Sequence, residues 1–327
     1  MIGQRTARRS LSSILAVAAW IAAGPAAAQS YPTRPILMAV GFAPGGGTDI
    51  VGRLIADKLS QRVAQPVVVA NVSGAGGTIA AQQVAQAAPD GYRLLFVSSA
   101  HTMSAALRPD LPYDAVKSYA PITKIADTPN LIVVHPSIGA STLSDLIALA
   151  RKQPGKLNYG SGGVGTNAHM STELLKSMAG IQITHVAYKG AGPFLSAMLS
   201  NEVQIGFATL PTALPHIRGG RLKGLAVTTR TRSAAIPDMP TADEAGVPGY
   251  EYSVWFGLLA PARTPAAIVN RLRDAVVAAL SDTALQERLK ADGSIAVGST
   301  PAEFGTFMAA ELAKWKTVVQ KAGIKGN

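Results

Sequence analysis

The chain has 327 residues, of which 48% are hydrophobic and 6% aromatic, and its formal net charge is +11. This length is enough for one large or two ordinary domains with substantial cores. The complete lack of cysteine excludes disulfides, thiol catalysis and thiolate metal sites. Basic residues are dispersed and do not alternate with aromatic residues, so we expect no nucleic acid as a partner.

The first 28 residues have the pattern of a secretory signal peptide. Arg5, Arg8 and Arg9 form a basic start, Leu11 to Ile21 an apolar stretch, and Ala26-Ala27-Ala28 an A-x-A cleavage site. The apolar stretch is shorter than the ~20 residues that a membrane span needs. Cleavage removes the three arginines and lowers the net charge from +11 to +8. The sequence therefore predicts a periplasmic protein and leaves the choice between Sec and twin-arginine export open.

After this segment, apolar runs alternate with helical patterns, which is typical of an α/β protein with largely parallel strands. The first block has three expected strands, each followed by a glycine-rich or polar loop, at Ile36–Val40, Val67–Ala70 and Leu94–Val97. Because ligands bind at the carboxyl ends of strands in open α/β sheets, these loops are candidates for a site. The stretch from Tyr113 to Asp127 looks irregular, and Leu131–His135 is the next expected strand.

The second block repeats this arrangement around a third glycine loop at Gly160–Thr166, which follows a strand and opens a helix from Asn167 to Met178. Further strands are expected at 183–187, 203–207 and 225–228. A strand at Val254–Ala260 returns the chain to the first block. Two helices follow, with threonine-proline starts at Thr264 and Thr300, the second completed by Glu303 in a capping box. We expect two domains, residues 29–128 plus 252–327 and residues 129–251, joined by crossing strands with the ligand between them.

The first glycine loop, Phe42-Ala43-Pro44-Gly45-Gly46-Gly47-Thr48-Asp49, lies where a strand meets a helix N-terminus. Unpaired N–H groups and the positive end of the helix dipole favour an anion there. A second helix N-terminus at Thr166 makes a pair suited to a carboxylate, bound by neutral donors without a buried salt bridge. Thr48 and Thr166 are also good N-caps, which need no ligand. Asp49 has two open roles, a structural charge in the first helical turn or a part in ligand binding or closure.

Enzyme motifs are incomplete. Gly160–Gly165 fits G-x-G-x-x-G, but the stretch Ile181–His185 contains no carboxylate for a ribose, and the first loop has no P-loop lysine. No G-x-S-x-G elbow occurs, and the histidines lack zinc-binding spacing. We therefore expect no cofactor, no metal and no enzymatic activity. An exported hydrolase that uses a glycine-loop serine remains the alternative, and His101 and His169 are candidate ligand contacts.

The chain also carries a set of short motifs in a fixed order from end to end. They are Tyr31-Pro32, Pro35-Ile36, Phe42–Asp49, Gly74-Ala75-Gly76-Gly77, Ala88–Tyr92, Pro154–Tyr159, Gly165-Thr166 with His169, Tyr188-Lys189-Gly190, Leu214–Ile217, Pro240-Thr241, Glu244-Ala245-Gly246 and Trp255–Pro261. In these the sequence resembles the periplasmic solute receptors of tripartite tricarboxylate transporters, also called Bug-type receptors. The similarity covers essentially all of the chain after the signal segment.

The resemblance implies a type II periplasmic binding-protein fold of two α/β domains joined by hinge strands. It also implies a monomer that closes on a small organic acid, a di-, tri- or aromatic carboxylate, and presents it to integral membrane permease subunits. A sensor role is compatible with the same fold. The ligand-binding residues carried over from the family are Phe42, Ala43, Gly45, Gly46, Gly47, Thr48, Asp49, Ser99, His101, Ser161, Gly165, Thr166, His169, Tyr188, Phe207 and Ala208.

The sequence departs from the family pattern at Phe207-Ala208-Thr209-Leu210, where relatives commonly carry an acid or amide. This departure favours a carboxylate with an apolar or aromatic body. Asn71-Val72-Ser73 replaces a commoner Asn-Arg-Pro, which loses a cation near the cleft. Family membership does not name the ligand.

Overall fold

The computed structural model describes residues 31–291 and 293–326, and from Arg34 onward the chain forms one compact unit. The predicted signal peptide, residues 1–28, lies outside the described residues. Within those residues, no helix is long and apolar enough to cross a membrane.

One mixed sheet organises this unit, with strands in the order β2-β1-β3-β9-β4-β7-β5-β6, and with β8 and β10 also paired to β4. The strands are β1 (Ile36–Val40), β2 (Val67–Asn71), β3 (Arg93–Ser98), β4 (Tyr119–Val134), β5 (Asn158–Ser161), β6 (Thr184–Ala187), β7 (Ile205–Thr209), β8 (Lys223–Val227), β9 (Ser253–Pro261) and β10 (Ile295–Ala296). Parallel pairs occur in two groups, β2-β1-β3 and β6-β5-β7. Antiparallel pairs of β4 and β9 connect these groups, so the sheet is less parallel than expected.

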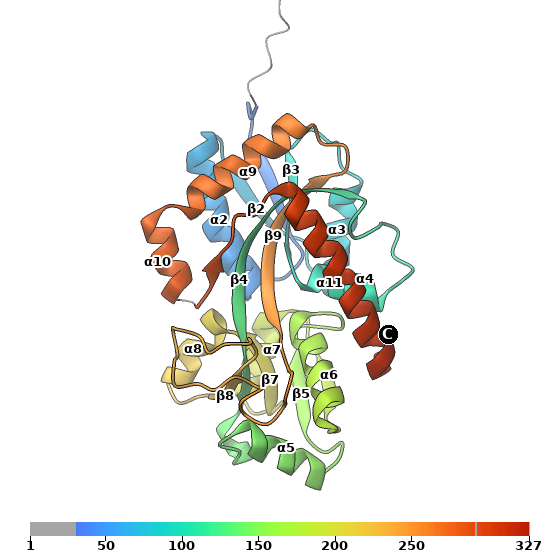
Figure 1. Ribbon diagram of the computed structural model, residues 1–327, viewed down its shortest axis with the longest axis vertical. Helices are drawn as coiled ribbons and strands as arrows, with labels where there is room; N and C mark the ends of the chain where they lie inside the picture. Colours follow the sequence, from blue (N-terminus) through green and yellow to red (C-terminus); the bar gives the residue numbers. More distant parts are fainter. Residues whose placement is uncertain (1–30, 292, 327) are drawn as a thin grey trace, which may run out of the picture. The chain divides into compact units, whose positions relative to one another are not determined.

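The long strand β4 corrects the expectation of irregular structure between Tyr113 and Asp127. Its first part pairs with β9 and its last five residues pair with β7. Strands β4 and β9 therefore run side by side in Figure 1. Pro121 made a strand improbable, because proline cannot donate to a ladder. The ladder accommodates it through register shifts between Pro121 and Thr123 and between Lys124 and Ala126.

Helices cover both groups of strands (Figure 1). They are α2 (Gly47–Val63), α3 (Thr78–Ala85), α4 (Ala100–Leu107), α5 (Leu143–Lys152), α6 (Asn167–Ala179), α7 (Ala191–Leu199), α8 (Leu210–Arg218), α9 (Ala266–Leu280), α10 (Thr283–Ala291) and α11 (Pro301–Ala322), with short 3-10 turns η1 (Ala75–Gly77) and η2 (Pro136–Ile138). The capping box of Thr300 and Glu303 is confirmed. Thr264 is not a cap, since Pro265 holds that position and the Thr264 hydroxyl donates to the Pro261 carbonyl at 2.7 Å.

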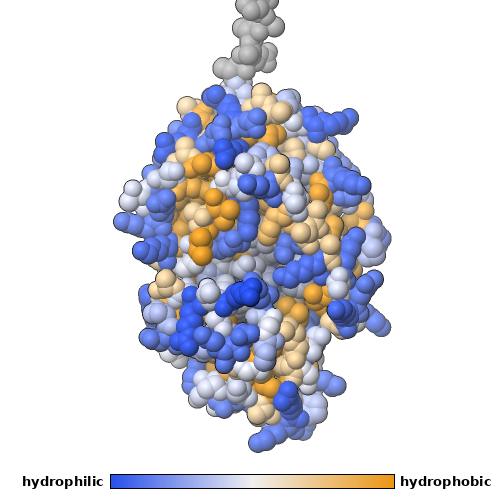
Figure 2. Space-filling model, viewed as in Figure 1, coloured by the Kyte–Doolittle hydropathy of each residue, from blue (hydrophilic) through white to orange (hydrophobic). Residues whose placement is uncertain are grey.

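Among the described residues, an apolar core packs against each group of strands. One gathers around Leu131, Phe194 and Met198. The other gathers around Trp255 and Phe304, whose rings meet edge to face with centroids 5.7 Å apart. On the face drawn in Figure 2, apolar residues are scattered among polar ones. The second core includes Ala39 of β1, the strand that leads into the first glycine loop.

Candidate functional site

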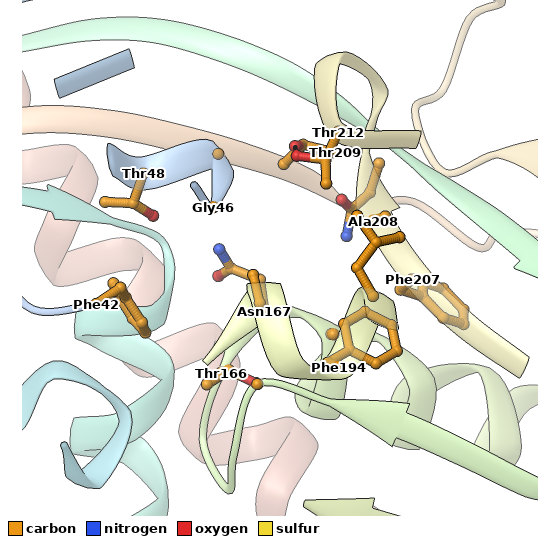
Figure 3. A pocket seen from close by; sticks show the side chains of 16 residues that line it. Phe42, Gly46, Thr48, Thr166, Asn167, Phe194, Phe207, Ala208, Thr209 and Thr212 are labelled. Carbon is orange, nitrogen blue, oxygen red and sulfur yellow. Dashed lines mark hydrogen bonds between the residues drawn. The ribbon is translucent and has the colours of Figure 1, made fainter. Parts of the chain in front are cut away.

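A pocket with an empty volume of about 650 Å³, part of it open to solvent, lies where the starts of α2 and α6 face the end of β7. Figure 3 shows Gly46 and Thr48 at one wall, Thr166 and Asn167 at a second, and the rings of Phe194 and Phe207 at a third. The lining consists of Phe42, Gly46, Gly47, Thr48, Asn130, Gly162, Thr166, Asn167, Ala168, Ala191, Phe194, Leu195, Phe207, Ala208, Thr209 and Thr212. None of these residues is charged.

The first wall is the N-terminus of α2. Gly46 is the N-cap, in an extended conformation, and no side chain caps the helix. The first-turn N–H groups of α2 therefore have no side-chain acceptor there and carry the positive end of the helix dipole. Glycine is required for the close approach at Gly47, because a Cβ there would lie 2.7 Å from Thr209 Oγ1. The loop thus brings bare main chain to the pocket.

Asp49 holds this loop in shape. Its carboxylate accepts hydrogen bonds from the Gly45 N–H at 3.0 Å and from Asn71 Nδ2 at 2.8 Å, and Arg53 pairs with it at 3.0 Å. Burial by itself raises the pKa of this carboxyl, but the hydrogen bonds and the Arg53 charge outweigh burial and lower the pKa below its ordinary value. Asn71 Nδ2 also lies 2.9 Å from the Phe42 carbonyl, so the same network reaches the pocket wall.

The second wall is the N-terminus of α6. Thr166 is the N-cap, yet its hydroxyl donates to the Gly163 carbonyl at 2.7 Å and caps no helical N–H. Gly165, with φ +82°, makes the turn into the helix, and its N–H donates to His169 Nδ1 at 3.2 Å. Two helix N-termini that lack side-chain caps therefore face one pocket, which is an arrangement suited to an anion.

Side chains that lie far apart in sequence fix the amide of Asn167 at this wall. Asn167 Oδ1 accepts from Ser99 Oγ at 2.9 Å, and Ser99 Oγ is also 2.8 Å from the hydroxyl of Tyr252. In Figure 3 the Asn167 amide points from the start of α6 toward Gly46 and Thr48. Ser99 therefore positions a lining residue and does not itself line the pocket.

Helix α4 and its C-cap residue Arg108 join two glycine loops, the second at Ser73–Thr78 and the third at Gly160–Thr166. Ser104 Oγ lies 3.1 Å from the carbonyls of both Gly76 and Gly165, and Arg108 donates to Ala75 O at 3.0 Å and to Val164 O at 3.4 Å. Ser104 near the end of α4 and Arg108 at its C-cap thus bind main-chain oxygens of the second and third loops.

The predicted histidines are buried beside the pocket and not in its lining. His101 lies in helix α4, although the sequence predicted a loop after the strand at Leu94–Val97. Its Nε2 lies 2.8 Å from the Ala115 carbonyl. The rings of His169 and His185 lie 4.4 Å apart. Burial lowers the pKa of each of these three imidazoles to about 4, and the neighbouring His185 lowers that of His169 further. They are neutral at physiological pH.

Seven of the predicted site residues line the pocket: Phe42, Gly46, Gly47, Thr48, Thr166, Phe207 and Ala208. Nine do not: Ala43, Gly45, Asp49, Ser99, His101, Ser161, Gly165, His169 and Tyr188. Tyr188 instead donates its hydroxyl to Glu202 at 2.9 Å. Whether any of the sixteen contacts a ligand stays a prediction.

Several lining residues were not predicted from the sequence. Among those that sequence reasoning missed are the polar residues Asn130, Asn167 and Thr212 and the bulky apolar residues Phe194 and Leu195. Asn167 directly follows the predicted N-cap Thr166, so its position in the first helical turn was a usable signal. Asn130 carried a weaker signal, as a single amide at the start of an apolar run.

A serine and a histidine do meet close to this site. Ser161 Oγ lies 2.6 Å from His185 Nε2 and 3.1 Å from the Gly163 carbonyl. Ser161 is 0% exposed and does not line the pocket. Among the described residues, no group of three or more His, Cys, Asp or Glu side chains is placed to hold a metal ion.

Comparison with known proteins gives a consistent set of relatives. A family model described as "Tripartite tricarboxylate transporter family receptor" matches residues 51–324. The chain is similar to Protein BugT of Bordetella pertussis, with 37% identity over 93% of this chain and 94% of BugT.

Solved structures show the same fold. The periplasmic binding protein BugD is 31% identical, with a TM-score of 0.87 over 91% of this chain and 100% of BugD. The R. palustris protein Rpa4515, solved with adipate, is 38% identical, with a TM-score of 0.87 over 90% of this chain and 99% of that protein. The predicted fold class, a periplasmic binding-protein fold of α/β type, is confirmed by these likenesses.

Proposed function

Because the chain belongs to the family of tripartite tricarboxylate transporter receptors, we propose that it captures a small organic carboxylate in the periplasm and delivers it to the permease subunits of a membrane transporter. The observation that carries this proposal is the pair of helix N-termini, α2 and α6, that face one pocket without side-chain caps. The adipate bound to Rpa4515 supports the same ligand class.

The carboxylate is held by neutral donors in this proposal. Main-chain N–H groups of the first turns of α2 and α6 donate to its oxygens, and the hydroxyl of Thr48 and the amide of Asn167 flank it. No lining side chain is charged, so the ligand's charge is compensated by dipoles and not by a buried ion pair. The apolar body of the acid packs on Phe194, Leu195 and Phe207.

Closure completes the site in the proposed mechanism. Residues 29–128 with 252–327 act as one domain and 129–251 as the other, and β4 and β9 cross between them as hinge strands. Each domain contributes one helix N-terminus, so the full donor set exists only in the closed state. Ligand therefore stabilises that state by mass action.

A thermal-shift screen of residues 29–327 tests the binding role. Mono-, di- and tricarboxylates and aromatic acids are each compared with the neutral amide of the same carbon skeleton, after unfolding and refolding to remove carried-over ligand. Amino acids and nucleotides are screened alongside them. We expect a concentration-dependent rise in Tm with one class of carboxylate, equivalent to about 2.7 kcal/mol at a hundredfold excess over Kd, and no rise with the amides. A shift produced only by nucleotides refutes the proposal.

A pair of glycine variants locates the site. In Gly46→Ala the new Cβ lies 3.0 Å from the Ala191 Cβ across the pocket, whereas in Gly305→Ala it meets only Pro121 at an ordinary 3.5 Å. We expect the first variant to weaken binding several-fold and the second to leave it unchanged, with the far-UV spectrum of both preserved. Equal affinity in both variants places the ligand elsewhere.

The delivery step needs a separate measurement. Uptake of the labelled carboxylate is compared in cells with and without the receptor, and in cells that carry Gly46→Ala. We expect uptake to require a receptor that binds. Binding without any effect on uptake favours a sensor receptor instead.

The alternative of an exported serine hydrolase has one observation in its favour, the short contact of Ser161 with His185. Activated esters and intact-mass measurement test it. Stoichiometric acylation of Ser161 supports the hydrolase and contradicts the receptor.

A further inference from the structure

One buried polar atom in the pocket has no partner among the described residues. Asn130 is 1% exposed and lines the pocket, and its Nδ2 has no hydrogen-bond acceptor. Buried amide donors are nearly always paired, so an orphan that faces a cavity indicates a group that the cavity receives.

The backbone of Asn130 is fully engaged, so its position is fixed. Its N–H donates to Thr228 Oγ1 at 3.2 Å, and its carbonyl accepts from the Thr228 N–H at 2.9 Å. The residue sits on β4 directly opposite Thr209 of β7. The hydroxyls of Thr209 and Thr212 pair with each other at 2.9 Å, and neither accepts a hydrogen bond from Asn130 Nδ2.

Apart from Thr209, the residues of β7 and α7 that line the pocket with Asn130 are apolar. Phe207 and Ala208 come from the neighbouring strand and Phe194 from α7, and all three line the same pocket. The two helix N-termini already supply donors for one carboxylate. An unpaired amide donor beside these apolar residues is therefore suited to a second, separate acceptor on the same ligand.

We propose that Asn130 binds a second carboxylate of the ligand, so that the receptor selects linear dicarboxylates over monocarboxylates of equal length. This inference rests on the proposed function, because it requires the first carboxylate to lie at α2 and α6. A monocarboxylate places its methyl end against the Asn130 amide and leaves Nδ2 without an acceptor. A dicarboxylate supplies a charged acceptor there.

Calorimetric titration with matched acids tests the inference. Dicarboxylates from succinate to suberate are compared with monocarboxylates of the same carbon number, from butanoate to octanoate. In the wild type we expect the best dicarboxylate to bind roughly ten- to hundredfold more tightly than its monocarboxylate, the range for a hydrogen bond to a charged group.

Two variants then remove the donor, Asn130→Leu at similar size and Asn130→Ala at smaller size. We expect both to lose the preference by weakening dicarboxylate binding while monocarboxylate binding is kept or improved. Thr128→Val is the matched control, since it removes a buried hydroxyl from the same strand. This hydroxyl lies 2.7 Å from Ser294 Oγ, and Thr128 does not line the pocket. This variant should keep the wild-type preference.

The outcomes separate this inference from the function beneath it. If the wild type binds both series equally, or if the Asn130 variants weaken both equally, the inference is wrong and the carboxylate receptor stands. If no acid of either series binds, the inference is wrong, and the thermal-shift screen with tricarboxylates and aromatic acids decides whether the proposed function fails with it. The wild-type comparison decides even if neither variant folds.

Discussion

Replacing Gly47 with alanine is expected to force apart two walls of the pocket. The new Cβ would lie 2.7 Å from Thr209 Oγ1 and 3.0 Å from Thr209 Cγ2. Because these two groups fill two of the three staggered positions on the threonine Cβ, rotation about χ1 always leaves one of them near Gly47. The backbone has to move instead.

The size of the effect follows from this geometry. Overpacking that shifts the backbone costs about 1–3 kcal/mol. Loss of the Thr209–Thr212 hydrogen bond, now 2.9 Å, adds about 0.5–1.5 kcal/mol if the threonine also turns. We therefore expect Gly47→Ala to lower the free energy of unfolding by roughly 1–4 kcal/mol.

A double-mutant cycle with Thr209→Ala isolates the contact. That variant removes both clashing atoms, so Gly47→Ala should cost little in its background and the coupling energy should exceed about 1 kcal/mol. Urea unfolding followed by far-UV circular dichroism, without ligand, measures all four proteins. Gly52→Ala is the matched control. Its new Cβ would lie 3.3 Å from the Phe96 ring, and neither residue lines the pocket. Equal costs in both backgrounds refute the clash.

Two further changes test the supporting network. Asp49→Asn should lower the free energy of unfolding by about 1.5–3 kcal/mol, because the buried carboxylate loses charge-assisted bonds from Gly45 and Arg53; an unchanged urea midpoint argues against a structural role. The pKa of buried His101 is about 4 in the fold, against an ordinary 6.5, so the unfolded chain binds its proton first as pH falls. The fold's preference for neutral His101 therefore adds to the free energy of unfolding above pH 6.5. This contribution is lost progressively towards pH 4, and the loss between pH 7 and pH 5 is about 2 kcal/mol. The loss should shrink in His101→Gln, and an equal loss in both proteins would assign it to other groups.

The first glycine loop was predictable because its signals are local. A continuous apolar run, Ile36–Val40, ends in three glycines and then a helical pattern, and the observed strand has the same bounds. Gly46 takes the N-cap position and the helix follows at once. Such features depend on neighbouring residues only, so a single sequence displays them.

The missed elements depend on partners that are distant in sequence. Strand β4 tolerates Pro121 because β9 pairs with it through a shifted register. Helix α4 was expected as a loop, since every residue from Ala100 to Leu107 is buried and the segment has no polar face to give a helical period. Asn130 enters the pocket through its pairing with Thr209, which no local pattern reports.

The place of β9 in the sheet governs the order in which the chain can fold. Strand β3 has β9 as its antiparallel neighbour, with Ser98 opposite Phe256, and β4 pairs with β9 over most of its length. The group β2-β1-β3 is therefore not joined to β4 until residues 253–261 are in place. Long-range pairing of this kind raises contact order and slows folding, because loop closure has to precede the contacts that stabilise it. A nascent chain that ends before β9 lacks the strand that joins β3 to β4, so the two groups of strands can form one sheet only once the last quarter of the chain is present.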